Sequence, residues 1–377
     1  MADHPGAARR ALLPATLAAA LSVVIATACL GEEPAAKVCS TCKGTGKIPC
    51  PAHTYSLKGK FQLVCSRCNL PSCCNGLGWT PCPKCKREDI KQEYDGALAA
   101  WKDEAKHELG YPDKLGENTA RAATRHFRIQ GPFTHPQFHD YGEKLERCHA
   151  YFQDIFGENA DADLPWTKCQ ICVFEQHATY EKFVRSCAGG ERADAWLELA
   201  LKSSGLRHPT IPCSTTYINE AGHGRRKDDD VQHGLIHNVA HIYLETYKTG
   251  NRSPAWLGEG FAGHCEIVVL GSPEAYCVEY GSAGSHNRNR WRALLKSAVD
   301  KGKLRDFEEL SRVQLAEMNE VDGAQAIAVV DVLVTKKDKF VKFVLAQKDG
   351  TGAVEALKEH YQLEPRKLRM WWYTRLH

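Results

Sequence analysis

The chain has 377 residues, which is enough for one large domain and a small one. Hydrophobic residues make up 43% of the sequence, so a soluble protein with a packed core is expected. The formal net charge of +3 argues against a nucleic-acid-binding surface and against a membrane-surface binder, so we expect no nucleic-acid partner.

The first 28 residues have the layout of a secretory signal peptide. Arg9 and Arg10 precede an uncharged stretch over residues 11–28 that ends in Ala-Thr-Ala. Cys29 follows at once, so lipid attachment at Cys29 is the one membrane contact that the sequence predicts. No other segment is long and apolar enough to span a bilayer. We therefore expect a protein outside the cytoplasm: secreted, periplasmic or lipid-anchored in the cell envelope.

Residues 29–89 form a cysteine-rich segment without apolar periodicity. Nine of the 17 cysteines lie between Cys39 and Cys85, among many glycines and prolines, and a segment of this kind needs cross-links to fold. It contains an internal repeat at an offset of 32 residues. The Cys-x-Gly-x-Gly sequence that starts at Cys42 returns at Cys74, and Pro71 stands where the first copy has Cys39.

Four pairs in this segment have the spacing with which a tight turn presents two ligands to a tetrahedral zinc ion: Cys39/Cys42, Cys50/His53, Cys65/Cys68 and Cys82/Cys85. Two groupings fit. In one, the first two pairs form a site, and Cys74 and the last pair form another with one of Cys65, Cys68 or Cys73. In the other, the outer pairs combine with each other, as do the inner pairs. Export also permits disulfides, but disulfides do not explain the glycine-punctuated repeat, so zinc is the expected cofactor.

The CxxCxGxG form of residues 39–46 resembles the repeats of the DnaJ cysteine-rich domain. The resemblance covers a small part of the chain and implies a small zinc-ribbon-like module. In that family, outer pairs bind one ion and inner pairs another. Since only the first copy is complete, chaperone activity does not follow. An interaction protein that works through this module is one candidate function.

Residues 90–118 are expected to form a helical linker, because an apolar stripe runs over residues 90–109 before Pro112. In the large domain, residues 119–377, we expect strands over 126–129, 168–174 and 214–218, and helices over 141–156 and 179–186. The later helices span residues 231–249, 254–269, 287–300, 323–333, 337–347, 351–361 and 364–375. Early strands and late helices predict an α+β fold with a small sheet and a mostly helical C-terminal half.

Two smaller expectations concern the core of this domain. Cys169 and Cys172 lie three residues apart in a strand, so they face opposite sides and belong to the core or to disulfides. In the last helix, the apolar stripe of Leu368, Trp371 and Trp372 is expected to pack on the core.

The candidate active site lies in the two helices after residue 231. His237 and His241 stand at i and i+4 in His-Asn-Val-Ala-His, hence on one face of a helix. Glu259 follows in the sequence Trp-Leu-Gly-Glu-Gly, which opens the next helix. Two histidines on one helix and a glutamate on the next form a three-ligand zinc site with an open position.

This layout resembles the gluzincin (peptidase MA-like) metallopeptidases, whose motif is HExxH followed by WLxEG. The order and spacing of the strand 126–129, the strand-helix unit 169–184 and the tail 325–371 are similar too, so the likeness covers residues 119–377. It implies a gluzincin-like fold and a zinc ion held by His237 and His241 with Glu259.

Two departures put peptidase activity in doubt. The family's glutamate after the first histidine is the general base, and Asn238 stands in its place; an amide cannot accept a proton at neutral pH. The family's acidic residue four positions after the glutamate ligand is Gly263, and Glu266, one turn further on, is a candidate substitute. His233 and His264 flank the motifs and are candidates for a spare ligand, although a polar or capping role is the expected one for a lone histidine.

Together these features predict an exported zinc-binding pseudopeptidase that binds a polypeptide or protein partner. An active zinc metallopeptidase with an unusual general base is the alternative that a residual activity would favour. The sequence thus leaves open whether the chain is an enzyme, with the inactive state expected because of Asn238.

Overall fold

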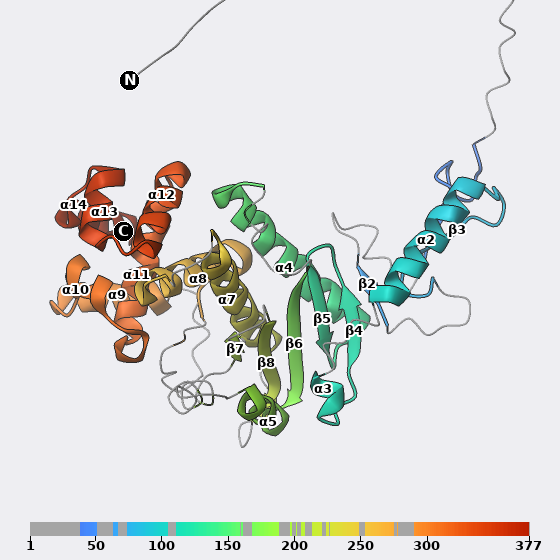
Figure 1. The fold of residues 1–377 in the computed structure, drawn as a ribbon, viewed down its shortest axis with the longest axis horizontal. Coiled ribbons are helices and arrows are strands. Elements are labelled where there is room, and N and C mark those ends of the chain that lie inside the picture. Colours follow the sequence, from blue (N-terminus) through green and yellow to red (C-terminus); the bar gives the residue numbers. More distant parts are fainter. Residues whose placement is uncertain are drawn as a thin grey trace, which may run out of the picture.

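The computed structural model describes residues 38–50, 63–66, 74–104, 111–158, 160, 168–187, 197, 201, 205–207, 213–220, 224–225, 227–248, 253–274, 277 and 290–376. The expected signal peptide, Cys29, His53 and Cys68 lie outside these ranges. Within them, no helix is long and apolar enough to cross a membrane. Two sheets and many helices give a mixed α+β fold, so that class is confirmed (Figure 1).

The two copies of the cysteine repeat pair with each other. Strand β1 (Lys47–Pro49) lies antiparallel to β3 (Trp79–Pro81), with Ile48 opposite Thr80, its own counterpart in the repeat. The flanking backbone bonds are also equivalent, because Cys50 N donates to Gly78 O and Cys82 N donates to Gly46 O, both at 2.8 Å. The copies are therefore related by a local two-fold axis between β1 and β3. Helix α2 (Glu88–Glu104) follows.

Glycine is required at the turns of both copies. The two glycines of the first copy have φ angles of 84° and 74°, and their counterparts have 90° and 81°: Gly44, Gly46, Gly76 and Gly78. A side chain at Gly76 would place a Cβ 2.6 Å from the carbonyl oxygen of Cys65, so the turn also packs too closely for any larger residue. The repeat pattern thus encodes a turn geometry as well as ligand spacing.

The larger sheet has the order β2-β4-β5-β6-β8-β7, with β9 (Gly224–Arg225) paired to β8. Its strands are β2 (Val64–Cys65), β4 (Ala120–Ala123), β5 (Phe127–Gly131), β6 (Cys169–Gln176), β7 (Gly205–Arg207) and β8 (Cys213–Glu220). The central strands β5, β6 and β8 run parallel, and the other pairings are antiparallel. Strand β2 comes from the cysteine-rich segment, so this segment adds the outermost strand beyond β4.

Helices cover both faces of this sheet. On one face, β5 and β6 pack against α4 (His135–Phe156) and α7 (Asp228–Thr246) in the main core. On the other, α5 (His177–Cys187) packs with Phe174 and Tyr217, next to the short helix α3 (Tyr111–Lys114). Cys169 belongs to the first core and Cys172 to the second, and neither is in a disulfide, so the expected core role on opposite faces is confirmed.

The C-terminal half is helical, as expected. Figure 1 shows α7 and α8 (Ala255–Leu270) between the sheet and the remaining helices. These are α9 (Arg290–Asp300), α10 (Phe307–Arg312), the 3-10 turn η2 (Leu315–Glu317), α11 (Glu320–Leu333), α12 (Lys337–Lys348), α13 (Ala353–Tyr361) and α14 (Pro365–Leu376). Helix α10 was not expected, although the capping box formed by Asp306 and Glu309 marks its start.

A buried lysine holds the C-terminal end of α7. The Nζ of Lys348 donates to the carbonyl oxygens of Leu244 at 3.2 Å and Glu245 at 3.0 Å, and also to that of Tyr247. The last carbonyls of a helix have no partner within the helix, so a buried ammonium group at this end satisfies them and complements the helix dipole. The end of the helix that carries His237 is thus fixed by α12.

The expectation for the last helix is correct for Leu368 and wrong for Trp371. Leu368 is 1% exposed, whereas Trp371 is 44% exposed. Helix α14 packs on α10 and α11, and Leu368 is the buried contact, while Met370 and Tyr373 are also exposed. The side chain of Trp372 lies outside the described part. An aromatic stripe on a terminal helix did not indicate burial here because the neighbouring helices cover only part of its length.

Candidate metal centres

Helices α7 and α8 bring the expected ligands together. Helix α7 begins with three aspartates in its first turn, whose negative charges stabilise the helix by their interaction with the positive end of its dipole. The middle of the helix is buried. Glu259 lies one turn into α8, itself 2% exposed. His241 Nε2 lies 3.1 Å from Glu259 Oε1, His237 Nε2 lies 3.4 Å from Oε2, and the two Nε2 atoms are 3.1 Å apart. The three side chains converge on one point.

A fourth donor, which the sequence did not indicate, completes this group. The Sγ of Cys277 lies 3.5 Å from Nε2 of both His237 and His241. The backbone N–H of Cys277 donates to Glu259 Oε2 at 3.1 Å. One donor atom from each of the four residues lies within 4.8 Å of the others, so the set can hold one metal ion. Cys277 is 18 residues beyond Glu259 in a loop, where no periodicity reveals its position.

Glu266 orients the first histidine, as the sequence suggested it could. Its carboxylate, which is fully buried, accepts from His237 Nδ1 at 2.8 Å and from His233 Nδ1 at 2.6 Å. A proton fixed on Nδ1 leaves the lone pair of His237 Nε2 free to face the other donors, which is the arrangement of metal-bound histidines. His233 therefore binds Glu266 and is not part of the four-residue group. His264 lies elsewhere, with Nε2 2.6 Å from the Tyr151 hydroxyl.

Close helix packing explains why the acid is not at residue 263. A Cβ on Gly263 would lie 2.5 Å from Cδ1 of Ile327 on α11. A Cβ on Gly260, one turn earlier, would lie 2.6 Å from the backbone oxygen of Ala326. Helix α8 thus presents a groove of glycines to α11 and has no room for a side chain there. The carboxylate that supports His237 comes instead from Glu266, on the face of α8 that points to α7.

We expect Gly260→Ala to destabilise the protein by about 1–3 kcal/mol, because the backbone of α11 cannot move away as a side chain could. Gly234→Ala, in α7, is the matched control. No atom lies within 4 Å of a Cβ built on Gly234, so this change is expected to stabilise its helix by up to about 1 kcal/mol. Urea unfolding of both variants measures the difference. Equal free energies of unfolding would contradict the close α8–α11 contact.

The charges of the group favour a cation. Burial opposes ionisation of Glu259, but the two histidines hold the pKa of its carboxyl well below its usual range. Burial also disfavours charged imidazoles, yet Cys277 and Glu259 raise the pKa of His237 well above its usual value and that of His241 to about 9. Protons therefore bind tightly among these donors, and a divalent metal ion can supply the same positive charge.

Asn238 lies beside this group but is not one of its donors. It is 5% exposed and occupies α7 between the two histidines. A Cβ built on Gly205 of strand β7 would lie 3.2 Å from Asn238 Nδ2, so the amide faces this strand. The structure thus places the residue at the general-base position under the β7 end of the sheet.

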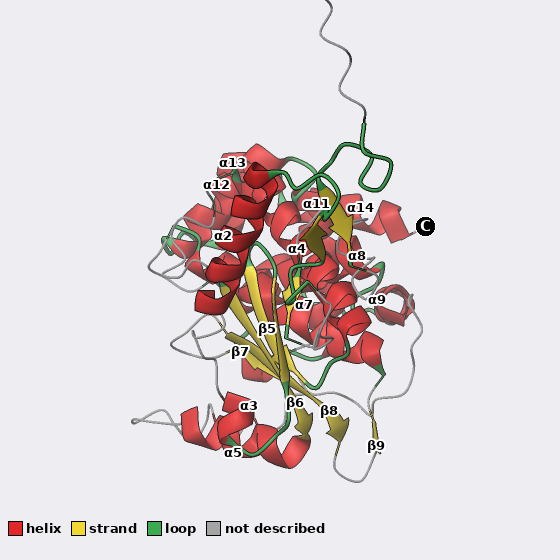
Figure 2. Ribbon diagram, turned by 90° about the vertical axis from the view of Figure 1, so that its right-hand side faces the viewer, coloured by secondary structure: helices red, strands yellow, loops and turns green. Residues whose placement is uncertain are grey.

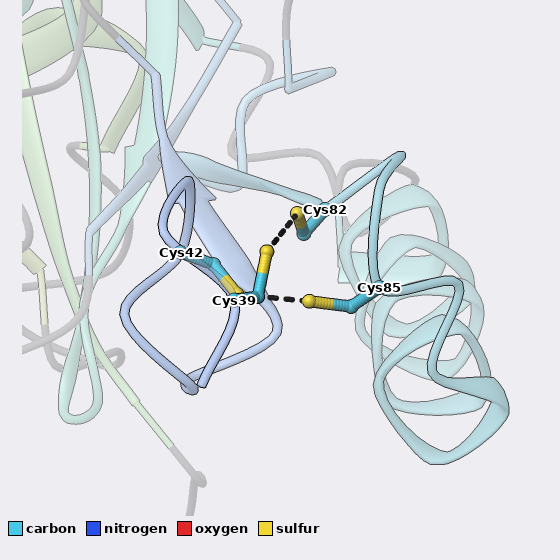
Figure 3. A group of neighbouring side chains, drawn as sticks. All are labelled: Cys39, Cys42, Cys82 and Cys85. Atoms are coloured by element: carbon cyan, nitrogen blue, oxygen red, sulfur yellow. Dashed lines mark hydrogen bonds between the residues drawn. The ribbon is translucent and has the colours of Figure 1, made fainter. Parts of the chain in front are cut away.

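The second group is the set of four cysteines from the outer pairs, Cys39, Cys42, Cys82 and Cys85. Cys42 Sγ lies 3.1 Å from Cys85 Sγ, and Cys39 Sγ lies 4.0 Å from Cys82 Sγ. Figure 3 shows the four sulfurs pointing toward one another from the two copies of the repeat. Two sulfurs on a tetrahedral zinc ion are separated by about 3.8 Å, so the set fits such an ion. This is the outer site of the crossed grouping.

Hydrogen bonds lower the pKa of two of these thiols. Hydrogen bonding by the Cys42 amide, helped by Cys85 and the Thr41 amide, lowers the pKa of Cys39 to about 6. The Cys85 side chain lowers the pKa of Cys42. Thiolates are the form that binds zinc, and none of these four cysteines is in a disulfide. The contacts thus favour the thiolate at Cys39 and Cys42, whereas the contacts with Cys42 and Cys39 raise the pKa of Cys85.

The inner ligands are only partly described. Cys74 Sγ accepts from Gly78 N at 3.0 Å, and burial followed by a contact with Cys50 raises its pKa to about 11. The local two-fold axis makes this Cys50–Cys74 contact the counterpart of the outer group. Cys65 instead lies 3.0 Å from His135 Nδ1. A second zinc ion on the inner pairs stays a prediction, because His53 and Cys68 fall outside the described residues.

A third cluster, His126, Glu146 and His149, has residue types that can bind a metal, but its two imidazole rings are not oriented to do so. His126 Nδ1 lies 2.7 Å from Glu146 Oε2, and His149 is close by. The rings of His126 and His149 are stacked, however, with centroids 3.6 Å apart and planes 14° from parallel. Ring nitrogens of stacked imidazoles point along parallel planes rather than toward one point. This cluster therefore ties α4 to β5 and is not a metal centre.

Comparison of the chain with protein-family models finds no match, and a search of curated proteins also finds none. The likenesses to gluzincins and to the DnaJ cysteine-rich domain thus depend on the motifs and on the two donor groups. The structure establishes a mixed α+β protein with a four-cysteine group and a His/Glu/Cys group, each able to hold a metal ion.

Proposed function

We propose that this chain is an exported zinc-binding pseudopeptidase, with a gluzincin-like domain that binds polypeptide without cleaving it. Zinc at His237, His241 and Glu259 is supported by the convergence of their donor atoms and by the carboxylate of Glu266 behind the first histidine. Zinc in the DnaJ-like module is supported by the four outer sulfurs. Export, with or without a lipid anchor at Cys29, is supported by the character of residues 1–28.

Asn238 is the observation that carries the proposal. It sits in the buried helix turn between the two histidines, where a peptidase of this type needs a carboxylate. General-base catalysis contributes about 10²–10⁴-fold to rate, and an amide cannot supply it. The two carboxylates that contact the histidines, Glu259 and Glu266, are engaged as ligand and as hydrogen-bond acceptor. Neither is free to act in place of Asn238.

A polypeptide would bind along strand β7, at the edge of the sheet. This strand ends the strand order of the described sheet and packs on α7, above Asn238. An extended peptide can add to such an edge through main-chain hydrogen bonds, with its side chains giving specificity. A peptide bound there would pass next to the metal group without meeting a general base. Binding without cleavage is the expected behaviour.

Zinc content and proteolysis of the full-length chain test the proposal. We expect His237→Ala to lower the zinc content by one ion per chain. His360→Ala, at a partly buried residue of α13, is expected to leave it unchanged. We also expect the native protein not to cleave unfolded casein. Casein cleavage that a chelator stops and His237→Ala abolishes would establish an active peptidase instead. An unchanged zinc content in His237→Ala would show that this group does not bind the metal.

A further inference from the structure

We propose that the thiolate of Cys277 is the fourth ligand of the metal bound by His237, His241 and Glu259, so that the centre is closed by four protein ligands. The inference rests on the proposed function, because it requires a metal at these residues. It changes the character of the site, since a three-ligand centre keeps an open position for substrate or water and a four-ligand centre does not. Closed tetrahedral sites are structural ones.

The donor separations match the edges of a zinc tetrahedron. Zinc–nitrogen bonds of about 2.0 Å and zinc–sulfur bonds of about 2.3 Å place nitrogen and sulfur about 3.6 Å apart on a tetrahedron. Cys277 Sγ lies 3.5 Å from each histidine Nε2. The other edges, 3.1 Å between the histidines and 3.1–3.4 Å from them to Glu259, are also close to tetrahedral values. The sulfur thus stands at the corner that the other three ligands leave open.

The loop that carries Cys277 is held against the site at two points. Glu266, which orients His237, also accepts from the backbone N–H of Glu274 at 2.8 Å. Cys277 N donates to the ligand carboxylate of Glu259 at 3.1 Å. The loop leaves α8 through Gly271, whose φ of 91° turns the chain back. The two glutamates that build the metal group therefore also fix the approach of the thiol, which is unlike a chance contact of a surface cysteine.

Metal binding at Cys277 exchanges a thiol proton for a metal bond. When the metal binds, one metal–sulfur bond forms and the thiol proton leaves to solvent, so the step needs no oxidant or reductant. The resulting centre links Cys277 to α7 and α8. Together with Asn238, it gives a second, independent reason for lack of hydrolysis.

Cobalt substitution of the full-length protein tests the inference. A cobalt–thiolate bond gives a charge-transfer band in the near ultraviolet, to which the four-cysteine module contributes in every variant. We expect Cys277→Ser to lose part of this band and to bind the metal at least about 10-fold more weakly, since even outer partners of metal ligands are worth 10–100-fold. Cys187→Ser, which alters a cysteine remote from both groups, is expected to keep the band and the affinity.

The outcomes separate this inference from the proposed function. If His237→Ala loses one metal ion but Cys277→Ser keeps the band and the affinity, Cys277 is not a ligand and the metal-binding proposal stands. If His237→Ala keeps all its metal, both proposals fail. Alkylation provides a measurement on the native chain: zinc is expected to protect Cys277, but not Cys187, from N-ethylmaleimide, with peptide mass spectrometry as the readout. Equal labelling of Cys277 with and without zinc would overturn the inference.

Discussion

Serine in place of Cys39 and Cys42 is expected to unfold the cysteine module and to leave the large domain folded. In the described part of the module, β1 and β3 have three residues each and few apolar side chains are buried, among them Leu77, Trp79 and Ile90. A core of this size does not offset the loss of chain entropy on folding, whereas structural zinc sites contribute of order 10 kcal/mol of folding free energy. Without two of its four sulfurs the ion is lost, and the fold is expected to go with it.

Hydrogen exchange followed by mass spectrometry measures this effect locally. Amides of residues 38–50 and 74–87 are expected to lose protection, while those of α11 and α12 keep it. A chelator is expected to reproduce the loss in the native protein. Lys84→Ser, an exposed change between Cys82 and Cys85, is the matched control. Full protection of the double-serine variant would mean that the module folds without the four-cysteine site. Partner binding that disappears with the module, but not with His237→Ala, would favour the interaction-protein alternative.

Glutamate in place of Asn238 is expected to create proteolysis only when Cys277 is also removed. The double variant Asn238→Glu/Cys277→Ala supplies both missing elements, a general base and an open coordination position. We expect its chelator-sensitive cleavage of casein to exceed that of Cys277→Ala by about 10²–10⁴-fold, which corresponds to about 3–5 kcal/mol of transition-state stabilisation. Asn238→Glu alone is expected to show little gain, because the thiolate still fills the fourth position.

Asn238→Gln in the same Cys277→Ala background is the matched control, since glutamine has the size of glutamate and no basic oxygen. Equal rates for the Glu and Gln double variants would show that the general base is not what the site lacks. A large gain from Asn238→Glu alone would instead argue that Cys277 does not block the centre. The comparison therefore separates the two reasons proposed for the absence of hydrolysis.

Sequence periodicity predicted most of the long helices, though not α10, and the metal ligands that α7 carries. His237 and His241 share a face because they are four residues apart in a helix, and this relation holds whatever surrounds it. Glu259 followed from its motif. The same logic predicted the central strands β5, β6 and β8. It missed β4, β7 and β9, which have two to four residues each and are too short for alternation to show.

Features that depend on contacts between distant segments could not be predicted from the sequence. Cys277 lies beside the ligands because the backbone N–H groups of Glu274 and Cys277 donate to Glu266 and Glu259. No fixed spacing in the sequence predicts either hydrogen bond. The choice between the two cysteine groupings depended on the pairing direction of β1 and β3, which a repeat does not specify. From the sequence, Gly263 was interpreted as the loss of an acidic residue. The close approach of Ile327 shows that the packing of α8 on α11 requires a glycine there.

The crossed grouping of the outer cysteines has a consequence for the evolution of the module's length. An ion that joins Cys39/Cys42 to Cys82/Cys85 closes a loop over residues 43–81. The entropy of closing a loop grows with the logarithm of its length, so doubling the loop adds only about 0.6 kcal/mol. Strands β1 and β3 already bring the two ends of this segment side by side (Figure 2 shows the same fold from the side). Insertions and deletions between residues 53 and 63, which leave β2 and every ligand pair intact, should therefore be tolerated far better than any change in spacing within a ligand pair.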